Sequence, residues 1–257
     1  MRLAGTVAVV TGGAQGIGRA IAARFVRESA RAVVIADRSQ AVNDVAGEIG
    51  AHPFVGDVSK EADVRRLVSD TLAAHQRLDL FCSNAGIAVG GSLERSTDAD
   101  WQSIWDVNVM AHVYAARAVV PHMLGAVGGY LLNTASAAGL LSQIGGAPYA
   151  VTKHAAVAFA EWLAITYGDR GIKVSCLCPQ GVKTAMLQNA GARSTALLGD
   201  AALEPDVVAD AVVAGLDAER FLILPHPEVA EYFRRKATDY DRWLRGMRRL
   251  QAQLPAD

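Results

Sequence analysis

The sequence predicts one α/β domain, built as a doubly wound parallel sheet of about seven strands with helices on both faces. Three observations lead to this prediction. Short apolar runs alternate with segments of helical pattern along the chain. Most of these runs are apolar throughout, as strands covered on both faces are. No linker, internal repeat or low-complexity segment divides residues 1–257, so a single domain is expected.

The elements follow the chain in order. Strands are predicted at 6–11, 32–37, 52–57, 78–84, 129–136, 172–178 and 220–225. Helices are predicted at 16–29, 39–49, 59–76, 97–123, 149–168 and 204–217. Ser59 and Asp98 are expected at helix starts, where a short polar side chain accepts from free N–H groups. Right-handed crossovers between parallel strands bring the strand ends to one edge of the sheet.

The amino-acid composition and net charge indicate which kinds of binding partner to expect. With 51% hydrophobic and 20% charged residues, the chain suits one globular domain with a large core. A net charge of −1 gives no electrostatic reason to expect nucleic acid or an anionic membrane as partner. No apolar run reaches the roughly 18 residues of a membrane helix, and no signal-peptide pattern opens the chain. Three sparse cysteines exclude a disulfide scaffold, so a cytoplasmic location is expected.

Residues 227–250 predict a C-terminal helical extension. Seven Lys or Arg and three acids fall within 231–250, and apolar residues recur there at helical spacing. The simplest interpretation is an amphipathic helix docked on the domain with a solvated basic face. The alternatives are a subunit contact or a lid over the substrate. No aromatic platform for RNA accompanies the basic residues.

A glycine-rich turn, "VAVVTGGAQGIGRA" at 7–20, departs from both common phosphate-binding patterns. The P-loop pattern fails because Arg19 and Ala20 replace its lysine and hydroxyl residue. The G-x-G-x-x-G pattern fails because Ile21 replaces its third glycine. The order of strand, glycines and a helix from Gly16 is still that of a dinucleotide turn, where backbone N–H groups and the helix N-terminus hold a pyrophosphate. The alternative is a turn that binds nothing.

An acid at the end of the second strand favours NAD. Asp37 follows Gly18 by 19 residues, where a carboxylate accepts hydrogen bonds from ribose hydroxyls and repels a 2′-phosphate. Gln15, rather than a basic residue, lies in the loop. Arg38 and Arg19 keep NADP open as the alternative, because an arginine can bind that phosphate.

A tyrosine and a lysine one helical turn apart form the candidate catalytic pair. Tyr149 and Lys153 share a helix face at i and i+4. An ammonium beside a phenol lowers the pKa of the phenol from about 10, so Tyr149 is a candidate general acid or base. The pair alone is common on helices. Ser136 at the end of the fifth strand, and Asn108 in the preceding helix, are expected at the same edge of the sheet.

With these motifs the sequence resembles the short-chain dehydrogenase/reductase family, from Gly5 to about Leu224. The resemblance implies a single-domain Rossmann fold. The family's T-G-x-x-x-G-x-G pattern and its Asn-Ala-Gly motif match Thr11, Gly12, Gly16, Gly18, Asn84, Ala85 and Gly86. Ser83 stands where members usually carry a further Asn. The family's Asn-Ser-Tyr-Lys tetrad maps onto Asn108, Ser136, Tyr149 and Lys153.

The resemblance implies a role for each member of the tetrad. Tyr149 exchanges the proton with the alcohol or carbonyl oxygen, and Ser136 hydrogen-bonds that oxygen. Lys153 binds the nicotinamide ribose and lowers the pKa of Tyr149, and Asn108 holds a water that links Lys153 to bulk solvent. The expected cofactor-binding residues are Gly12, Gln15, Gly16, Ile17, Gly18, Asp37, Arg38, Asp57, Val58, Asn84, Ala85, Gly86, Tyr149, Lys153, Val182 and Thr184. Of these, Asp57 and Val58 are expected at the adenine, and Val182 and Thr184 at the carboxamide.

The substrate region is expected after the sixth strand. There Gln180 separates Pro179 from Gly181, where family members usually show Pro-Gly. Gln180 is expected either near the substrate or the nicotinamide, or in solvent at a changed turn. The resemblance implies a mobile substrate loop over 184–203. Candidate substrate contacts are Gln143, Gln180, Met186 and Leu187. The apolar Met186, Leu187, Leu197 and Leu198 of the loop favour a largely apolar molecule. No cluster has metal-ligand spacing, so no metal is expected.

The sequence therefore predicts an NAD(H)-dependent oxidoreductase that interconverts a secondary alcohol and a ketone. The alternatives are an NADP-dependent carbonyl reductase of 3-oxoacyl type and a non-catalytic NAD-binding sensor. Phosphoryl transfer is not expected, because the loop lacks the Walker lysine. The resemblance also implies a homotetramer or homodimer built on helices such as the one that carries Tyr149.

Overall fold

The structure is a computed structural model of the chain that describes residues 1–89, 93–126 and 128–255. Its strands are β1 (Val7–Thr11), β2 (Ala32–Asp37), β3 (His52–Val55), β4 (Leu80–Ser83), β5 (Gly129–Thr134), β6 (Ile172–Leu177) and β7 (Leu222–Ile223). Its α-helices are α1 (Gly16–Arg27), α2 (Val42–Ile49), α3 (Glu61–His75), α4 (Asp98–Trp105), α5 (Ala111–Gly125), α6 (Ala138–Leu141), α7 (Ala147–Tyr167), α8 (Ala185–Gln188), α9 (Gly191–Leu198), α10 (Pro205–Asp217), α11 (Glu228–Thr238) and α12 (Tyr240–Gln253). A π-helix η1 (Asp106–Met110) and a 3₁₀ turn η2 (Gly168–Arg170) complete them.

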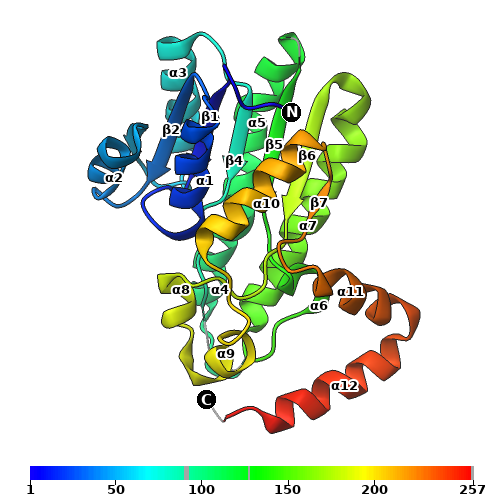
Figure 1. The fold of residues 1–257 in the computed structure, drawn as a ribbon. Coiled ribbons are helices and arrows are strands. Elements are labelled where there is room, and N and C mark those ends of the chain that lie inside the picture. The colour runs from blue at the N-terminus through cyan, green and yellow to red at the C-terminus, as the bar shows by residue number, and fades with distance from the viewer. Residues whose placement is uncertain (90–92, 127, 256–257) are drawn as a thin grey trace.

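All strand pairs in the sheet are parallel, and the spatial order is β3-β2-β1-β4-β5-β6-β7. The order reverses direction between β1 and β4, which is the switch point where doubly wound sheets bind ligands. The predicted fold class is thus confirmed (Figure 1). Among the described residues, no helix has both the length and the apolar character needed to cross a membrane.

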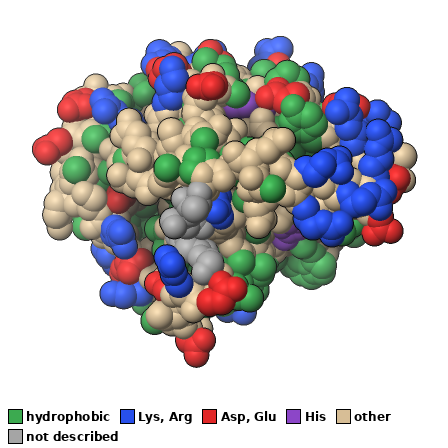
Figure 2. All heavy atoms as spheres, turned by 90° about the horizontal axis from the view of Figure 1, so that it is seen from below, with side chains coloured by type: hydrophobic (Ala, Val, Ile, Leu, Met, Phe, Trp, Pro, Cys, Tyr) green, Lys and Arg blue, Asp and Glu red, His purple; other side chains and the backbone are tan. Residues whose placement is uncertain are grey.

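The predicted C-terminal extension is two helices rather than one. The break falls at Asp239, whose extended backbone (φ −148°, ψ 92°) ends α11. Its carboxylate accepts from Arg242 N at 2.9 Å and so caps the start of α12. Figure 1 places α11 and α12 below the sheet, and Figure 2 shows Lys and Arg side chains gathered on the right, where these helices lie.

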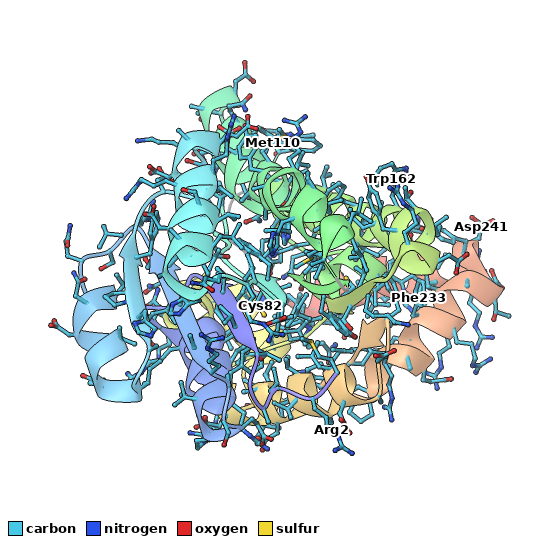
Figure 3. The ribbon with its side chains drawn as sticks, turned by 90° about the horizontal axis from the view of Figure 1, so that it is seen from above. Arg2, Cys82, Met110, Trp162, Phe233 and Asp241 are labelled. Carbon is cyan, nitrogen blue, oxygen red and sulfur yellow. The ribbon has the colours of Figure 1, made fainter. Side chains whose placement is uncertain are left out.

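Two helical layers enclose the sheet. Helices α3, α5 and α7 pack on one face and α1, α2 and α10 on the other. Successive strand residues alternate between the layers, because side chains of a strand point to opposite faces: Val9 joins the first layer, and Val10 joins the second. Figure 3 shows Cys82, on the second face of β4, in the middle of the molecule. The covered sheet explains why its strands are apolar throughout.

Two predicted helix starts differ from the structure. The cap of α4 is Thr97 rather than Asp98, because Thr97 and Asp100 exchange side-chain and backbone hydrogen bonds as a capping box. Lys60 rather than Ser59 precedes α3, since the Ser59 hydroxyl donates to Asp57 instead. The predicted helix 97–123 is also divided, because η1 interrupts it between α4 and α5.

Candidate active site

A cleft of about 1580 Å³ opens at the carboxyl ends of the strands. Every predicted site residue except Asn108 lines it. The predicted residues in its wall are Gly12, Gln15, Gly16, Ile17, Gly18, Asp37, Arg38, Asp57, Val58, Asn84, Ala85, Gly86, Ser136, Gln143, Tyr149, Lys153, Gln180, Val182, Thr184, Met186 and Leu187. The topology therefore gathers motifs that lie far apart in the sequence into one space.

The glycine turn leaves no room for side chains. At Gly18 a Cβ would lie 2.2 Å from the carbonyl oxygen of Gly12, and at Gly12 it would lie 2.9 Å from Ala85 Cα. Gln15 precedes α1 without a side-chain cap, so the first N–H groups of the helix keep their hydrogen-bonding capacity. A turn of this kind, open to the cleft at a helix N-terminus, fits the pyrophosphate of a dinucleotide.

Asp37 is held at the end of β2 by backbone donors. Its Oδ2 accepts from Ala14 N at 3.2 Å and its Oδ1 from Ser39 N at 3.0 Å. Each carboxylate oxygen keeps a further lone pair for a hydroxyl in the cleft. Nearby, Arg19 pairs with Glu48 on α2 at 2.8 Å. The Asp37 carboxylate is therefore held in place at this end of the cleft. Arg19, one of the two arginines that keep NADP open, has a carboxylate partner of its own.

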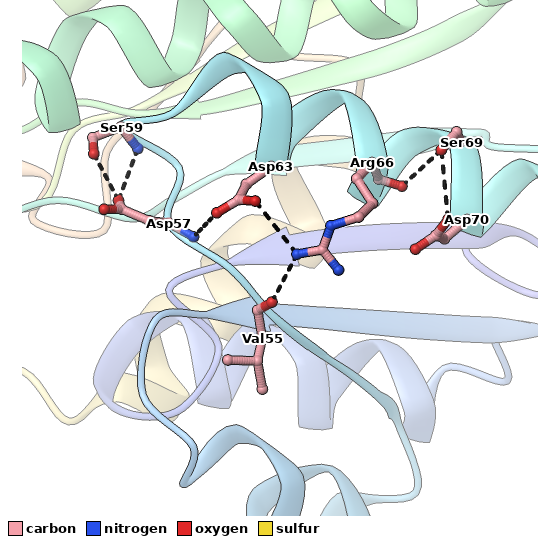
Figure 4. A network of polar contacts seen from close by, with 7 residues as sticks. All are labelled: Val55, Asp57, Ser59, Asp63, Arg66, Ser69 and Asp70. Carbon is pink, nitrogen blue, oxygen red and sulfur yellow. Dashed lines mark hydrogen bonds and ion pairs between the residues drawn. The ribbon is translucent and has the colours of Figure 1, made fainter.

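The loop after β3 is fixed by a polar network (Figure 4). Asp57 N donates to Asp63 Oδ2 at 2.9 Å, and Asp57 Oδ1 accepts from the backbone N and the hydroxyl of Ser59. The hydrogen bond from Asp57 N is the largest cause of the lowered pKa of Asp63. Arg66 contacts Asp63 at 3.4 Å and donates to Val55 O. This network holds the backbone at Asp57 against the cleft.

The Asn-Ala-Gly motif joins the glycine turn to the tetrad. Thr11 Oγ1 accepts from Asn84 N and Ala85 N, each at 3.0 Å, and Asn84 Nδ2 donates to Thr11 O. A Cβ on Gly86 would lie 3.3 Å from the Asn108 side chain and 3.4 Å from Lys153 Nζ. The motif therefore passes directly against two members of the tetrad.

Helix α7 brings Tyr149 and Lys153 to the cleft, and the segment after β5 brings Ser136. Ser136 Oγ accepts from Ala138 N at 3.1 Å and contacts Pro179 O at 3.4 Å. Lys153 is buried and donates to Thr134 O at 3.1 Å. Burial lowers the pKa of Lys153 to about 8.

The expected lowering of the Tyr149 pKa by Lys153 is not found. Burial raises the pKa of Tyr149, and the neighbouring Ser136 hydroxyl opposes that rise. Lys153 Nζ lies 5.7 Å from the centre of the Tyr149 ring and is directed to a backbone carbonyl. In this structure the phenol is therefore held in its protonated form at neutral pH.

Asn108 lies behind the cleft wall, within the π-helix η1. Its Oδ1 accepts from Ile87 N at 2.9 Å, while its Nδ2 donates to Ile87 O and to Thr152 Oγ1. Both amide hydrogens are thus committed, so a water on Asn108 must use Oδ1 or the backbone. Single π-helical turns are frequent at functional sites, and this one could not be inferred from the sequence pattern.

A residue that the sequence analysis did not identify, His226, lies buried behind Gln180 at the cleft wall. Gln180 lines the cleft, and its N–H donates to the buried His226 Nδ1 at 3.2 Å. Residues 184–203, predicted as a mobile loop, carry α8 and α9; their mobility stays a prediction. The position of His226 just after β7 is a strand-end signal that could have identified it.

The C-terminal helices form the outer wall. The apolar residues Tyr232, Trp243, Met247 and Leu250 line the cleft, together with several arginines. This placement favours the lid among the interpretations of residues 227–250. In the described part of the chain, no group of three His, Cys, Asp or Glu side chains could hold a metal ion.

Comparisons with known proteins agree with this geometry. The family model for short chain dehydrogenases matches residues 6–195. A 1-deoxy-11-beta-hydroxypentalenate dehydrogenase from Streptomyces avermitilis is 34% identical over 236 residues, covering 89% of this chain and 87% of the relative. A meso-2,3-butanediol dehydrogenase from Serratia marcescens is 34% identical over 190 residues, covering 72% and 75%.

Solved structures extend the likeness to the whole fold. A short-chain dehydrogenase/reductase from Burkholderia phymatum, in complex with NAD, has a TM-score of 0.86 at 29% identity and covers 94% of this chain and 96% of its own. A 3-ketoacyl-(acyl-carrier-protein) reductase from Brucella melitensis, complexed with NADH, has a TM-score of 0.79 at 30% identity and covers 86% and 96%. Sheet order, cleft, motifs and sequence likeness agree, and the chain belongs to the short-chain dehydrogenase/reductase family of oxidoreductases.

Proposed function

We propose that this protein is an NAD(H)-dependent oxidoreductase that interconverts a secondary alcohol and a ketone. The observation that carries the proposal is the meeting of Tyr149, Ser136 and Lys153 in one cleft with the glycine turn and Asp37. A binding protein without turnover needs the turn and the acid alone, so the presence of all three polar groups beside them favours catalysis over a sensor.

The chemistry divides between cofactor and protein. A bound nicotinamide dinucleotide supplies or takes the hydride. Tyr149 is protonated at neutral pH, and burial favours that form; in reduction it donates its proton to the ketone oxygen and becomes a phenolate, and in oxidation the phenolate takes the proton of the alcohol. Ser136 Oγ hydrogen-bonds the same oxygen. Lys153 uses one of its three N–H donors on Thr134 O, so two remain for a ribose hydroxyl.

The acidic end of the cleft supports NAD as the cofactor. A 2′-phosphate beside Asp37 would meet a carboxylate fixed by two backbone donors, and the charge of Arg19 is balanced by Glu48. The Burkholderia and Brucella structures hold NAD and NADH, which agrees with this choice. Arg38 still lines the cleft and keeps an NADP-dependent carbonyl reductase of 3-oxoacyl type as the second candidate.

Apolar side chains at the substrate end support a largely apolar substrate. Met186 and Leu187 of α8 and Ile144 line the cleft near Gln143 and Gln180. The Streptomyces and Serratia relatives are named for alcohols, a hydroxypentalenate and a butanediol. The three cysteines are free and buried, which agrees with the expected reducing, cytoplasmic location.

Replacing the general acid tests the reaction. Tyr149→Phe is expected to lower turnover of secondary alcohols at least about 100-fold, because the proton donor is removed. Absorbance at 340 nm with NAD and a panel of alcohols measures turnover, and calorimetry measures NAD binding, which is expected to persist. Tyr167→Phe, near the end of the same helix and outside the cleft wall, is the control. Turnover by Tyr149→Phe at the wild-type rate would refute the mechanism.

Replacing Asp37 tests the preference for NAD over NADP. Asp37→Ala removes the carboxylate that repels a 2′-phosphate, so the kcat/KM preference for NAD over NADP is expected to fall about tenfold or more. Asp44→Ala on α2, outside the cleft wall, is the control. An unchanged preference in Asp37→Ala would remove Asp37 from this role.

A further inference from the structure

The outer part of the cleft contains positive charge that the proposed chemistry does not use. Helices α9, α11 and α12, with the cap residue between the last two, contribute five arginines and three acids to the wall. These are Arg193, Arg234, Arg235, Arg242, Arg249, Glu228, Glu231 and Asp239. The tetrad and the glycine turn lie on other elements, so these charges face the space beyond the reacting centre.

Two of the arginines share one carboxylate partner, Glu231. Arg234 and Arg235 both donate to Glu231, at 2.8 and 2.6 Å, and these contacts lower the pKa of Glu231 to about 2. Arg193 Nε donates to Pro255 O at 2.9 Å. The Arg234 and Arg235 charges therefore have a partner within α11 itself.

The side chains of Arg242 and Arg249 form no ion pair or hydrogen bond with any other described residue. They lie seven residues apart on the cleft face of α12, two helical turns along one side, with Gly246 between them. Arg249 Nη2 comes within 3.9 Å of the place where a Gly246 Cβ would be. The helix thus presents a stretch without a side chain, bracketed by two unpaired guanidinium groups.

The position of α12 is fixed by a buried lysine. Lys236 Nζ donates to Leu140 O at 2.6 Å and lies 5.0 Å from the Trp243 ring centre and 5.4 Å from the Tyr240 ring centre. This contact joins α11 and the first turn of α12 to α6, which follows Ser136. The two unpaired arginines therefore have a defined place relative to the tetrad.

We propose that α12 forms an oxyanion subsite at Gly246, between Arg242 and Arg249. On the proposed function, the substrate is then a secondary alcohol or ketone with an apolar body and a carboxylate or phosphate at its far end. Guanidinium groups bind both oxyanions in the same fork geometry. Trp243, Met247 and Leu250 alternate with the arginines and contact the apolar body beside the charged end.

A matched set of compounds tests the subsite by binding, independently of turnover. The set is 9-hydroxydecanoate, its methyl ester and 9-hydroxydecyl phosphate, with shorter and longer homologues of each. Calorimetry with the NADH-saturated protein, which cannot oxidise the alcohols, is expected to give the acid or the phosphate a Kd about tenfold below that of the ester, since two exposed charge contacts contribute modestly. The difference is expected to shrink at high salt.

Variants on the two sides of α12 localise the effect. Arg242→Gln/Arg249→Gln is expected to abolish the preference for the anion. Arg245→Gln/Arg248→Gln, which removes the same charge from exposed positions of α12 outside the cleft wall, is expected to retain it. Equal affinities for acid, phosphate and ester at every chain length would overturn the subsite, and so would an equal loss in both double variants.

Absorbance at 340 nm separates this inference from the proposed function. Anion-selective binding without NADH formation from any compound would leave the subsite standing and refute the alcohol dehydrogenase. NADH formation at equal kcat/KM from acid and ester, with equal affinities, would support the dehydrogenase and refute the subsite.

Discussion

At the scale of single residues, Lys153 belongs to the candidate site and at the same time lowers the stability of the folded protein near neutral pH. Its ammonium is buried, and its pKa of about 8 lies below the ordinary value of 10.5. The unfolded chain therefore binds more protons than the folded chain between these two pH values, and stability rises with pH across that window. Below about pH 8 the folded protein carries the full desolvation penalty of the charge.

Lys153→Met is expected to raise the free energy of unfolding by about 1–2 kcal/mol near neutral pH while abolishing turnover. The lowered pKa of Lys153 corresponds to about 3 kcal/mol of lost stability. Removing the lysine recovers this free energy, but it also removes the hydrogen bond to Thr134 O, which offsets part of the gain. The gain is expected to disappear as the pH rises toward 10.5. Urea denaturation at several pH values measures it, with the exposed Lys173→Met as control. A less stable Lys153→Met protein near neutral pH would contradict this account.

The placement of the predicted site residues in one cleft followed from the sequence, but their electrostatics did not. Strand ends and motif spacing predicted the cleft wall correctly, because parallel strands bring their carboxyl ends together. The direction of the Tyr149 pKa was wrong, because it depends on burial and on where Lys153 donates its hydrogen bond. The spacing of two residues along a helix predicts that their side chains are close. It predicts neither how deeply the phenol is buried nor which acceptor the lysine contacts.

At the scale of elements, the hydrogen bond from Lys236 to Leu140 O ties the C-terminal helices to the domain. Lys236→Met removes the buried hydrogen bond to Leu140 O and leaves that carbonyl without this donor. The variant is expected to lose about 1–3 kcal/mol of stability and to raise KM several-fold with kcat little changed, because α12 forms the outer wall. Hydrogen exchange is expected to quicken over 240–253.

Arg245→Met, at an exposed position of α12 outside the cleft wall, is the control for this variant. It is expected to leave exchange over 240–253 and KM near their wild-type values. Unchanged exchange over 240–253 in Lys236→Met would show that another contact fixes the helix.

Most elements followed from the sequence pattern: apolar runs and helical periods predicted the seven strands and the long helices between them. The short helices α6, α8 and α9 were not predicted. The π-helix at Asn108 escaped prediction because it changes only the backbone hydrogen-bonding partner, not the residue types. The break at Asp239 was not predicted, because Asp occurs both inside helices and at their N-caps. Tertiary contacts, which the sequence pattern does not give, decide between the two.

At the scale of the whole molecule, an apolar surface on α7 supports the expected homotetramer or homodimer. Ile165 is 83% exposed and Trp162 is 54% exposed, and the Trp162 ring stacks on Phe159. Figure 3 shows Trp162 at the outer edge of the molecule. Exposed apolar residues clustered on one helix are typical of protein–protein contacts, so we expect the subunit contact here.

Trp162→Arg/Ile165→Arg is expected to reduce the mass measured by light scattering to the 27.1 kDa of one chain. Two charges in the centre of an apolar contact would be left desolvated and unpaired. Val207→Arg, at an exposed position on α10, is the control and is expected to retain the mass of the assembly. A wild-type mass of 27.1 kDa would refute the assembly.

Helix α12, which forms the outer wall of the cleft, is also open to cleavage by a protease. Helix α12 buries no residue completely and carries four arginines, Arg242, Arg245, Arg248 and Arg249. A helix with so little burial opens locally at small free energy, and trypsin cleaves at arginine in opened segments. Any molecule that fills the cleft and contacts α12 therefore slows nicking there. The rate of nicking thus reports occupancy of the cleft for compounds that undergo no reaction and carry no chromophore.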